Sequence, residues 1–383
     1  MRVREWYRTE GFNELAFDMV TEVPYQKSAA KLNRFRWQTQ GGTPYRTLAN
    51  AVEIEGKRIE EKINEKTVQI LEENGFYKNG VPENSNVIYG VDRNEVKMPR
   101  TDVITAIEEY NTNHTDEKFH IDISEANQFY EDPASTVNIS IDDVGVKEQK
   151  ETGRSTKRPR KLKRKYVHNT IAHIESSGME YVLNARNTVA MIPILIAFLV
   201  NNVLLGKYVQ FYVDGARTLQ SAIFAGFAWL KSFGLILDWY HLKKKCEMEL
   251  SLALKGSQIR NEVLELILPQ LWLGKIDTAI KMLRDISESN LKKGKDTETL
   301  IGYFERNRAF IPCYALRKKL NLRNSSNRGE KENDLIVADR QKHNGMSWSK
   351  DGSVSLATVT ALHKNKGQKN WFKNGTLEFK LVA

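Results

Sequence analysis

The chain has 383 residues, a length of roughly two or three domains. Of these, 40% are hydrophobic and 9% aromatic, which suffices for a sizeable core and excludes global disorder. The 58 Lys and Arg residues outnumber the 48 Asp and Glu residues and give a net charge of +10, which favours a polyanionic partner. The only cysteines are Cys246 and Cys313, which excludes a disulfide scaffold and an all-cysteine zinc site and fits a reducing compartment.

The first 130 residues are expected to form a mainly helical N-terminal region. Apolar residues four and seven positions apart predict a helix over 48–73, and Asn74-Gly75 is a stop signal. Residues 76–100 have the composition of a linker, and a shorter helix is expected over 102–110. No sequence signature separates a helix-turn-helix from a helical packing domain here.

From residue 136 onwards the pattern changes to short apolar segments typical of a sheet. The apolar run 189–200 is shorter than the roughly 18–20 residues that a membrane span needs, so we expect a buried helix and no membrane partner. Pro193 is expected in the first turn of that helix. The order β-β-β-α-β-α-β predicts a mixed α/β sheet. Strands are expected over 136–142, 166–175, 180–185, 207–213 and 234–238, and helices over 189–205 and 216–229.

The remainder of the chain is predicted to be helical. Residues 239–320 lack strand patterns and show helical spacing of apolar residues. A helix is expected over 330–343, where Asn344-Gly345 stops it, and 354–362 is again apolar-periodic.

Three aspartates mark the carboxyl ends of predicted strands, which is where functional sites of open α/β sheets gather. Asp142, Asp214 and Asp238 end the first, fourth and fifth strands. Taken singly, each is as well explained as a strand-end residue or a helix N-cap. Convergent carboxylates are hard oxygen ligands that suit Mg²⁺ or Mn²⁺, and two such ions support phosphoryl transfer.

These acids lie in segments that resemble motifs of the DDE transposases, whose core has the ribonuclease H-like fold. The strand order, with Asp on the first and fourth strands, is similar to that fold. The residues Asp-Asp-Val-Gly-Val-Lys at 142–147 resemble the first-strand D-x-x-x-V-K motif. Asp-Gly-Ala at 214–216, followed by Asp-Trp-Tyr-His at 238–241, resembles the DGA and DxYH pair of Mutator-like bacterial insertion-sequence transposases.

A third segment resembles the glutamate motif SGxxE, R and GMxWS of the same transposases. It comprises Ser-Asn-Arg-Gly-Glu at 326–330, then Arg340, and Gly-Met-Ser-Trp-Ser at 345–349. Asn-Arg-Gly replaces the family's Gly-x-Val, which leaves Glu332 as the alternate to Glu330. The three motifs occur in order, and the resemblance covers about residues 130–370.

The resemblance implies a division of the chain into domains. Residues 131–245 and 322–383 would form the ribonuclease H-like catalytic core, with an all-helical insertion at 246–321. Residues 1–130 would recognise transposon ends.

The resemblance also implies that Asp142, Asp214 and Glu330 hold two Mg²⁺ (or Mn²⁺) ions and act as the catalytic triad. Asp142 and Asp143 point to opposite faces of a strand, so one of them can join the site, and the spacing to Val-Lys favours Asp142. Asp334, one helical turn beyond Glu330, is a candidate supporting group.

A basic run follows the first strand and is predicted to contact DNA phosphates. The alternative is a solvated hairpin tip. His241 is either a DNA contact or a partly buried residue behind an N-cap at Asp238. We expect no zinc site, and we expect most tryptophans to pack in the core rather than stack on bases. The basic residues are Lys157, Arg158, Arg160, Lys161, Lys163, Arg164 and Lys165.

The implied activity is a DNA transposase that hydrolyses phosphodiester bonds at transposon ends and transfers the 3′ hydroxyl into target DNA. The implied partner is double-stranded DNA, bound by a homodimer or larger assembly in the bacterial cytoplasm, at the nucleoid. Two alternatives stay open, a nuclease or resolvase of the same fold without strand transfer, and a non-catalytic DNA-binding protein derived from such an element.

Overall fold

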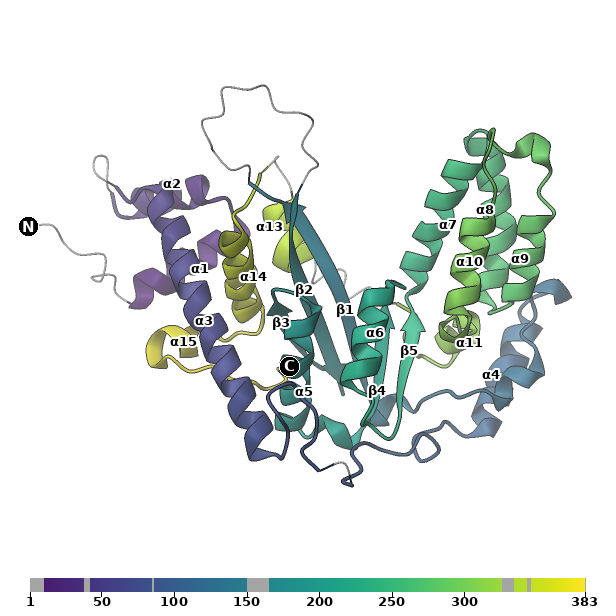
Figure 1. Cartoon of the computed structure of the whole chain (residues 1–383), viewed down its shortest axis with the longest axis horizontal. Coiled ribbons are helices and arrows are strands. Elements are labelled where there is room, and N and C mark those ends of the chain that lie inside the picture. Colours follow the sequence, from purple (N-terminus) through teal and green to yellow (C-terminus); the bar gives the residue numbers. More distant parts are fainter. Residues whose placement is uncertain are drawn as a thin grey trace, which may run out of the picture. The chain divides into compact units, whose positions relative to one another are not determined.

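A computed structural model describes residues 10–37, 42–84, 86–149, 165–325, 334–342 and 346–382 (Figure 1). The strands are β1 (Thr136–Lys147), β2 (Tyr166–Ser176), β3 (Met179–Ala185), β4 (Tyr208–Val213) and β5 (Phe233–Leu237). The α-helices are α1 (Glu10–Glu22), α2 (Tyr25–Phe35), α3 (Tyr45–Glu73), α4 (Arg100–Thr112), α5 (Thr188–Asn201), α6 (Arg217–Gly226), α7 (Trp239–Ala253), α8 (Ser257–Trp272), α9 (Ile276–Arg284), α10 (Glu298–Asn307), α11 (Tyr314–Lys319), α13 (Asp339–Gln341), α14 (Lys350–Lys364) and α15 (Gln368–Asn374). Short 3₁₀ helices are η1 (Glu117–Phe119), η2 (Ile123–Asn127), η3 (Pro133–Ser135), η4 (Leu204–Gly206), η5 (Glu288–Asn290) and η6 (Arg308–Phe310), and η7 (Asp334–Ala338) is a π-helix.

The five strands form one mixed sheet in the order β3-β2-β1-β4-β5. β2 and β3 are antiparallel, whereas β1 with β4 and β4 with β5 are parallel. Parallel strands require a crossover: the chain from β4 to β5 passes through α6, and the chain from β1 to β4 passes through β2, β3 and α5. The fold is therefore α/β with a mixed sheet, as the sequence predicts.

The chain divides into two compact units. One comprises residues 1–87, 141–204 and 328–383, and the other comprises 88–140 and 205–327. The expected functional boundary near residue 130 stays a prediction. None of the helices that the structure describes is long and apolar enough to cross a bilayer.

In the first unit, α14 packs against β2, β3 and the long helix α3. The helix α3 buries the predicted stripe, with Leu48, Val52, Ile59 and Ile70 each at most 6% exposed. Gly56 lies where α3 crosses α14, because a Cβ there would stand 2.4 Å from Cβ and 2.5 Å from Cα of Ser355. The glycine thus allows a closer approach of the two helices than any side chain would.

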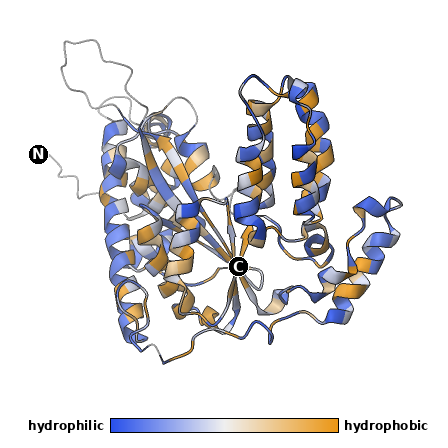
Figure 2. Cartoon of the chain, turned by 45° about the vertical axis from the view of Figure 1, so that its right-hand side comes forward, coloured by the Kyte–Doolittle hydropathy of each residue, from blue (hydrophilic) through white to orange (hydrophobic). Residues whose placement is uncertain are grey.

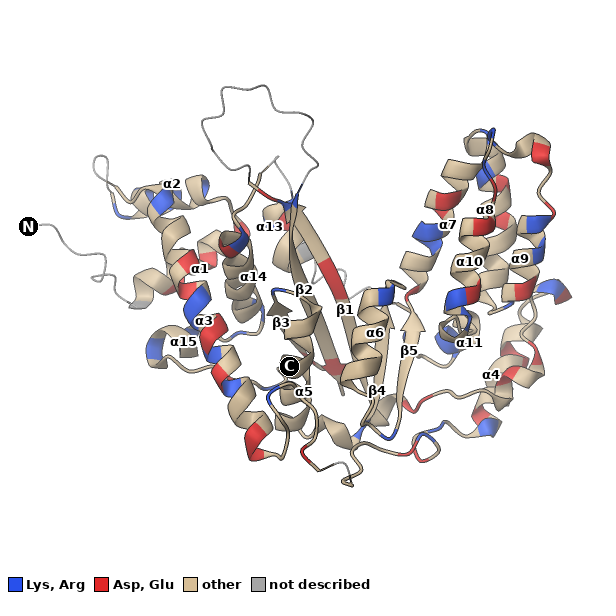
Figure 3. Ribbon diagram, viewed as in Figure 1, with Lys and Arg blue, Asp and Glu red and all other residues tan. Residues whose placement is uncertain are grey.

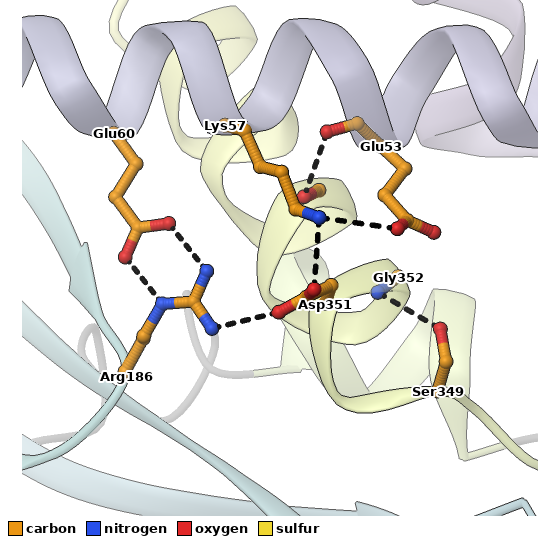
Figure 4. A network of polar contacts seen from close by, with 8 residues as sticks. Glu53, Lys57, Glu60, Arg186, Ser349, Asp351 and Gly352 are labelled. Carbon is orange, nitrogen blue, oxygen red and sulfur yellow. Dashed lines mark hydrogen bonds and ion pairs between the residues drawn. The ribbon is translucent and has the colours of Figure 1, made fainter.

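A polar network flanks this crossing (Figure 4). Arg186, just after β3, donates to Glu60 of α3 at 2.6 and 2.8 Å and to Asp351 of α14 at 2.9 Å. Lys57 lies 2.8 Å from Asp351 and 3.3 Å from Glu53. Lys57 and Arg186 hold the pKa of the Asp351 carboxyl below its usual value. The network ties three segments that are distant in sequence to one another.

The second unit contains the helical block and β4 and β5. Helices α7 to α10 carry hydrophobic stripes, visible as orange patches beside blue ones in Figure 2. These stripes form one core with Tyr212, Ile236 and Leu237 of the sheet. A smaller core joins α4 to α11. The expected all-helical character of residues 239–320 is confirmed.

The structure corrects three details of the sequence analysis. β1 does not end at Asp142 but runs to Lys147, because buried Val144 and Val146 continue the alternation beyond the acidic pair. Pro193 is the sixth residue of α5 rather than a first-turn residue, because the Asn187 side chain caps the helix and starts it at 188. The described part of 330–343 begins as the π-helix η7 instead of a regular α-helix.

The close crossing at Gly56 predicts a selective loss of stability. We expect Gly56→Ala to lower the free energy of unfolding by about 1–3 kcal/mol, because the added methyl group meets the Ser355 backbone. Gly11→Ala in α1 is the matched control, since nothing lies within 4 Å of its Cβ position. Urea unfolding followed by circular dichroism measures both, and equal stabilities of the two variants would contradict the close packing.

Candidate active site

The two aspartates of β1 have different environments. The structure shows Asp142 half-buried and Asp143 exposed, and acidic colour interrupts β1 partway along its length in Figure 3. The Asp142 Oδ1 accepts a hydrogen bond from the Asp143 N–H at 2.8 Å. The Asp143 carboxylate accepts hydrogen bonds from the hydroxyls of Thr170 on β2 and Thr188 on α5, the latter at 3.3 Å. Asp143 thus links β1 to β2 and to α5.

Asp214 begins the tight turn between β4 and α6. Its Oδ1 accepts from the Ala216 N–H at 2.8 Å, which fixes the carboxylate within the turn. Gly215 has φ +83°, and a Cβ there would lie 2.6 Å from the Tyr303 hydroxyl. This position therefore requires glycine on both conformational and steric grounds.

The helical block contacts this turn through α10. The Tyr303 hydroxyl donates to the Asp214 carbonyl oxygen at 3.2 Å. Burial, together with the nearby Asp214 charge, raises the pKa of Tyr303, so its hydroxyl stays a donor at neutral pH. One helical turn further, Asn307 accepts from Gln220 of α6 at 2.9 Å. Helix α10 thereby anchors both the Asp214 turn and the helix that follows it.

The register of the parallel pair β1 and β4 relates the two predicted site aspartates. The last pair is Ser140 with Tyr212. Asp142 and Asp214 each follow their member of this pair by two residues. Asp142 and Asp214 fall in different compact units.

Asp238 is a buried helix cap. It is 0% exposed, and its Oδ1 accepts from the N–H groups of Tyr240 and His241 at 2.7 and 3.1 Å. The N–H of Asp238 donates to the Val213 carbonyl, so the ends of β4 and β5 are linked directly before Asp214. His241 is half-buried, with Nδ1 3.6 Å from the Asp238 carboxylate. The N-cap interpretation of Asp238 is confirmed, and a DNA contact by His241 stays a prediction.

Several predicted site residues lie outside the described residues. These are Glu330, its alternate Glu332, and Lys157, Arg158, Arg160, Lys161, Lys163 and Arg164 of the basic run. Lys165 is described and exposed, and Asp334 lies in η7.

The Arg and Trp of the glutamate segment meet in the first unit. Arg340 is 3% exposed, and its Nε donates to the Val20 carbonyl at 2.8 Å. Its guanidinium carbon lies 4.9 Å from the Tyr25 ring centre and 5.5 Å from that of Trp348. Burial lowers the pKa of Arg340. This residue of the motif therefore acts in packing, and Trp348 is core, as expected for most tryptophans.

A buried polar network beneath β4 was not predicted from the sequence. Arg317 of α11 donates to both carboxylate oxygens of Glu131, at 2.5 and 2.8 Å, and each side chain is 2% exposed. Burial alone would lower the pKa of Arg317, but the attraction of Glu131 outweighs it and raises the pKa. Arg317 also contacts the Tyr212 hydroxyl, which donates to Asn138 of β1 at 2.9 Å. The network therefore links Tyr212 of β4 to Asn138 of β1, which lies two residues before the last paired residue of β1, Ser140.

The donor chemistry of Asp142 and Asp214 fits a hard divalent ion, because Mg²⁺ and Mn²⁺ prefer carboxylate oxygens. Among the described residues, no group of three or more His, Cys, Asp or Glu side chains is arranged to hold a metal ion. Glu330 is outside that set, so the predicted triad is left as a prediction.

The buried ion pair predicts strongly unequal effects of mutation. We expect Glu131→Gln to lower the free energy of unfolding by about 3–5 kcal/mol, because it leaves the Arg317 guanidinium buried without a counter-charge. The double variant Glu131→Gln/Arg317→Met is expected to recover part of this loss. Chemical unfolding measures both, and Asp277→Asn, which removes the exposed partner of Arg308, is the control with little expected change. Strictly additive effects of the two buried substitutions would contradict the pairing.

Comparison with known proteins adds little to this geometry. No protein-family model matches the chain, and no curated protein sequence matches it. Among solved structures, the chain is similar to one in a Drosophila P element transposase strand transfer complex, with 10% sequence identity and a TM-score of 0.28. That match covers 97% of this chain and 82% of the other. A TM-score this low carries no argument about fold or activity, so the functional assignment depends on the chain's own residues.

Proposed function

We propose that the chain is a DNA transposase whose core is ribonuclease H-like and whose active site contains Asp142, Asp214 and Glu330. The cofactor of this proposal is a pair of Mg²⁺ (or Mn²⁺) ions, and the substrates are the transposon ends and target DNA. The active species is a homodimer or larger assembly, because two DNA ends are processed.

One observation carries the proposal, namely the parallel pairing that ends at Ser140 and Tyr212. Asp142 lies on β1 and Asp214 directly follows β4, each two residues beyond its member of that last pair. Adjacent carboxylates repel one another unless a cation compensates their charge. We infer that the two acids share a metal site in addition to the main-chain hydrogen bonds that each accepts.

The sheet order supports the ribonuclease H-like core. In the order β3-β2-β1-β4-β5 the first strand is central and the fourth is beside it, and the first two motif aspartates belong to β1 and to the turn that follows β4. The helical block that follows β5 occupies the position of the insertion between the second aspartate and the glutamate. Asp143 is the weaker candidate because its carboxylate binds Thr170 and Thr188.

The residues of the chain orient the carboxylates for phosphodiester chemistry. The Asp143 N–H donates to the Asp142 Oδ1, and the Ala216 N–H donates to the Asp214 Oδ1. Tyr303 fixes the main chain at Asp214. When bound, the metal pair would lower the pKa of the attacking water or hydroxyl and would stabilise the negative charge on the phosphate. Water attacks the phosphate at the transposon end, and the 3′ oxygen leaves as a 3′ hydroxyl. This hydroxyl then forms a P–O bond to a phosphate of the target DNA while the 3′ oxygen of the target strand leaves, so no covalent enzyme intermediate is needed.

The proposal predicts that catalysis and DNA binding separate on mutation. Asp142→Asn and Asp214→Asn are expected to reduce cleavage at least about 100-fold, because each removes a metal ligand, while DNA affinity changes little. Asp143→Asn is the matched control and is expected to retain cleavage. The substrate is a plasmid with the coding sequence and its flanking genomic DNA, and gel retardation in Ca²⁺ measures binding.

The alternatives give different outcomes in the same experiment. A non-catalytic DNA-binding protein predicts that Asp214→Asn leaves every measurable activity intact. A nuclease or resolvase predicts cleavage but no joined product when a pre-cut DNA end is supplied with target plasmid. The transposase predicts joined product that requires Asp142 and Asp214 but not Asp143.

A further inference from the structure

A cavity of about 530 Å³ lies within the unit formed by residues 88–140 and 205–327. Its lining includes Tyr208 and Gln210 at the start of β4 and residues 233–236 of β5. Asp214 follows the opposite end of β4, so the cavity is separate from the candidate active site. Its volume falls in the range of about 300–1,000 Å³ that is usual for small-molecule sites.

One wall of the cavity is polar and built around a glycine. Gln210 and Tyr208 are 3% and 2% exposed. A Cβ on Gly234 would lie 2.2 Å from the Gln210 Oε1 and 2.8 Å from the Tyr208 hydroxyl, so the glycine leaves room for both groups. The Gln210 Nε2 already donates to the Phe211 carbonyl oxygen at 3.1 Å, so its second N–H and its Oε1 are the groups that can pair with the edge of a nucleobase.

The other walls carry aromatic rings. Phe224 of α6 and Phe310 of η6 have ring centres 5.9 Å apart, and Phe224 is 43% exposed. The Arg93 guanidinium carbon lies 4.3 Å from the centre of the Phe129 ring. Aromatic rings and guanidinium planes are the surfaces on which unpaired bases stack.

The charge of the lining favours an anionic group. The negative charge of Glu131 is compensated by Arg317 within the buried pair. The lining also includes the Glu125 carboxyl, whose pKa burial raises, so the three arginines of the lining outnumber its two glutamates by one. Arg93 and Arg308 add two guanidinium groups, of which Arg308 also pairs with an exposed aspartate. A ligand with a phosphate and a planar heteroaromatic ring satisfies these walls together.

We propose that this cavity binds one nucleotide, with its base among the phenylalanine rings and facing Gln210 and its phosphate near Arg93 and Arg308. The nucleotide is either free or an unpaired nucleotide of a DNA strand, and these two sources share the same chemistry. The binding does not depend on Asp142 or Asp214, so it stands or fails separately from the transposase proposal.

Fluorescence titration of the full chain in EDTA tests the site with 1,N⁶-etheno-AMP as the probe. We expect saturable binding that Phe224→Ala and Arg93→Gln each weaken by about 5- to 100-fold, the usual effect of losing a base-stacking group. Tyr240→Ala, with an equally exposed ring at 44%, and Arg284→Gln are the matched controls outside the lining. Both controls are expected to bind as the parent chain does.

Competition distinguishes the two sources. A single-stranded oligonucleotide of about 12 residues that displaces the probe more effectively than AMP and than the matching duplex identifies an unpaired DNA nucleotide. Displacement by AMP at least as effective as by the oligonucleotide identifies a free nucleotide. The proposal is overturned if the probe does not bind, if inorganic phosphate displaces it as well as AMP does, or if the lining variants bind it as the controls do.

Discussion

The parallel pairing of β1 with β4 is the constraint on which the rest of the structure depends. Side chains alternate along a strand, so a shift of one residue would exchange Asp142 and Asp143 between the two faces of the sheet. The register is supported by the hydrogen bond from Tyr212 to Asn138 and by the buried Arg317–Glu131 pair below it. A buried ion pair fixes geometry rather than adding much stability, which suits this role.

The helical block is coupled to the same region by specific contacts. Tyr303 and Asn307 of α10 hold the turn at Asp214 and the following helix α6. Because Gly215 leaves no space for a side chain against Tyr303, movement of α10 would be transmitted to the Asp214 main chain. The cavity proposed to bind a nucleotide lies beside the first residues of β4 and β5. Asp214 and Asp238 directly follow the last residues of these two strands.

The sequence predicts those features that follow from local periodicity. Apolar spacing predicts the stripe of α3, the five strands and the helical block, and Asp214 and Asp238 directly follow strands as the sequence predicts. Pairs such as Arg317 with Glu131, or Gly234 with Gln210, were not predictable because each is made by residues that only the tertiary fold brings together. The alternation over 136–142 predicts a strand that ends at Asp142, whereas the buried Val144 and Val146 continue β1 to Lys147.

Iron-directed cleavage of the polypeptide tests the central claim, a metal ion shared by Asp142 and Asp214, most directly. Fe²⁺ replaces Mg²⁺ in the full chain bound to DNA, and ascorbate with peroxide then generates hydroxyl radicals that cut the backbone beside the ion. The account predicts cuts near both residue 142 and residue 214, suppressed by excess Mg²⁺ and lost together in Asp214→Asn. Cuts near one residue alone, or cuts near 142 that persist in Asp214→Asn, would contradict it.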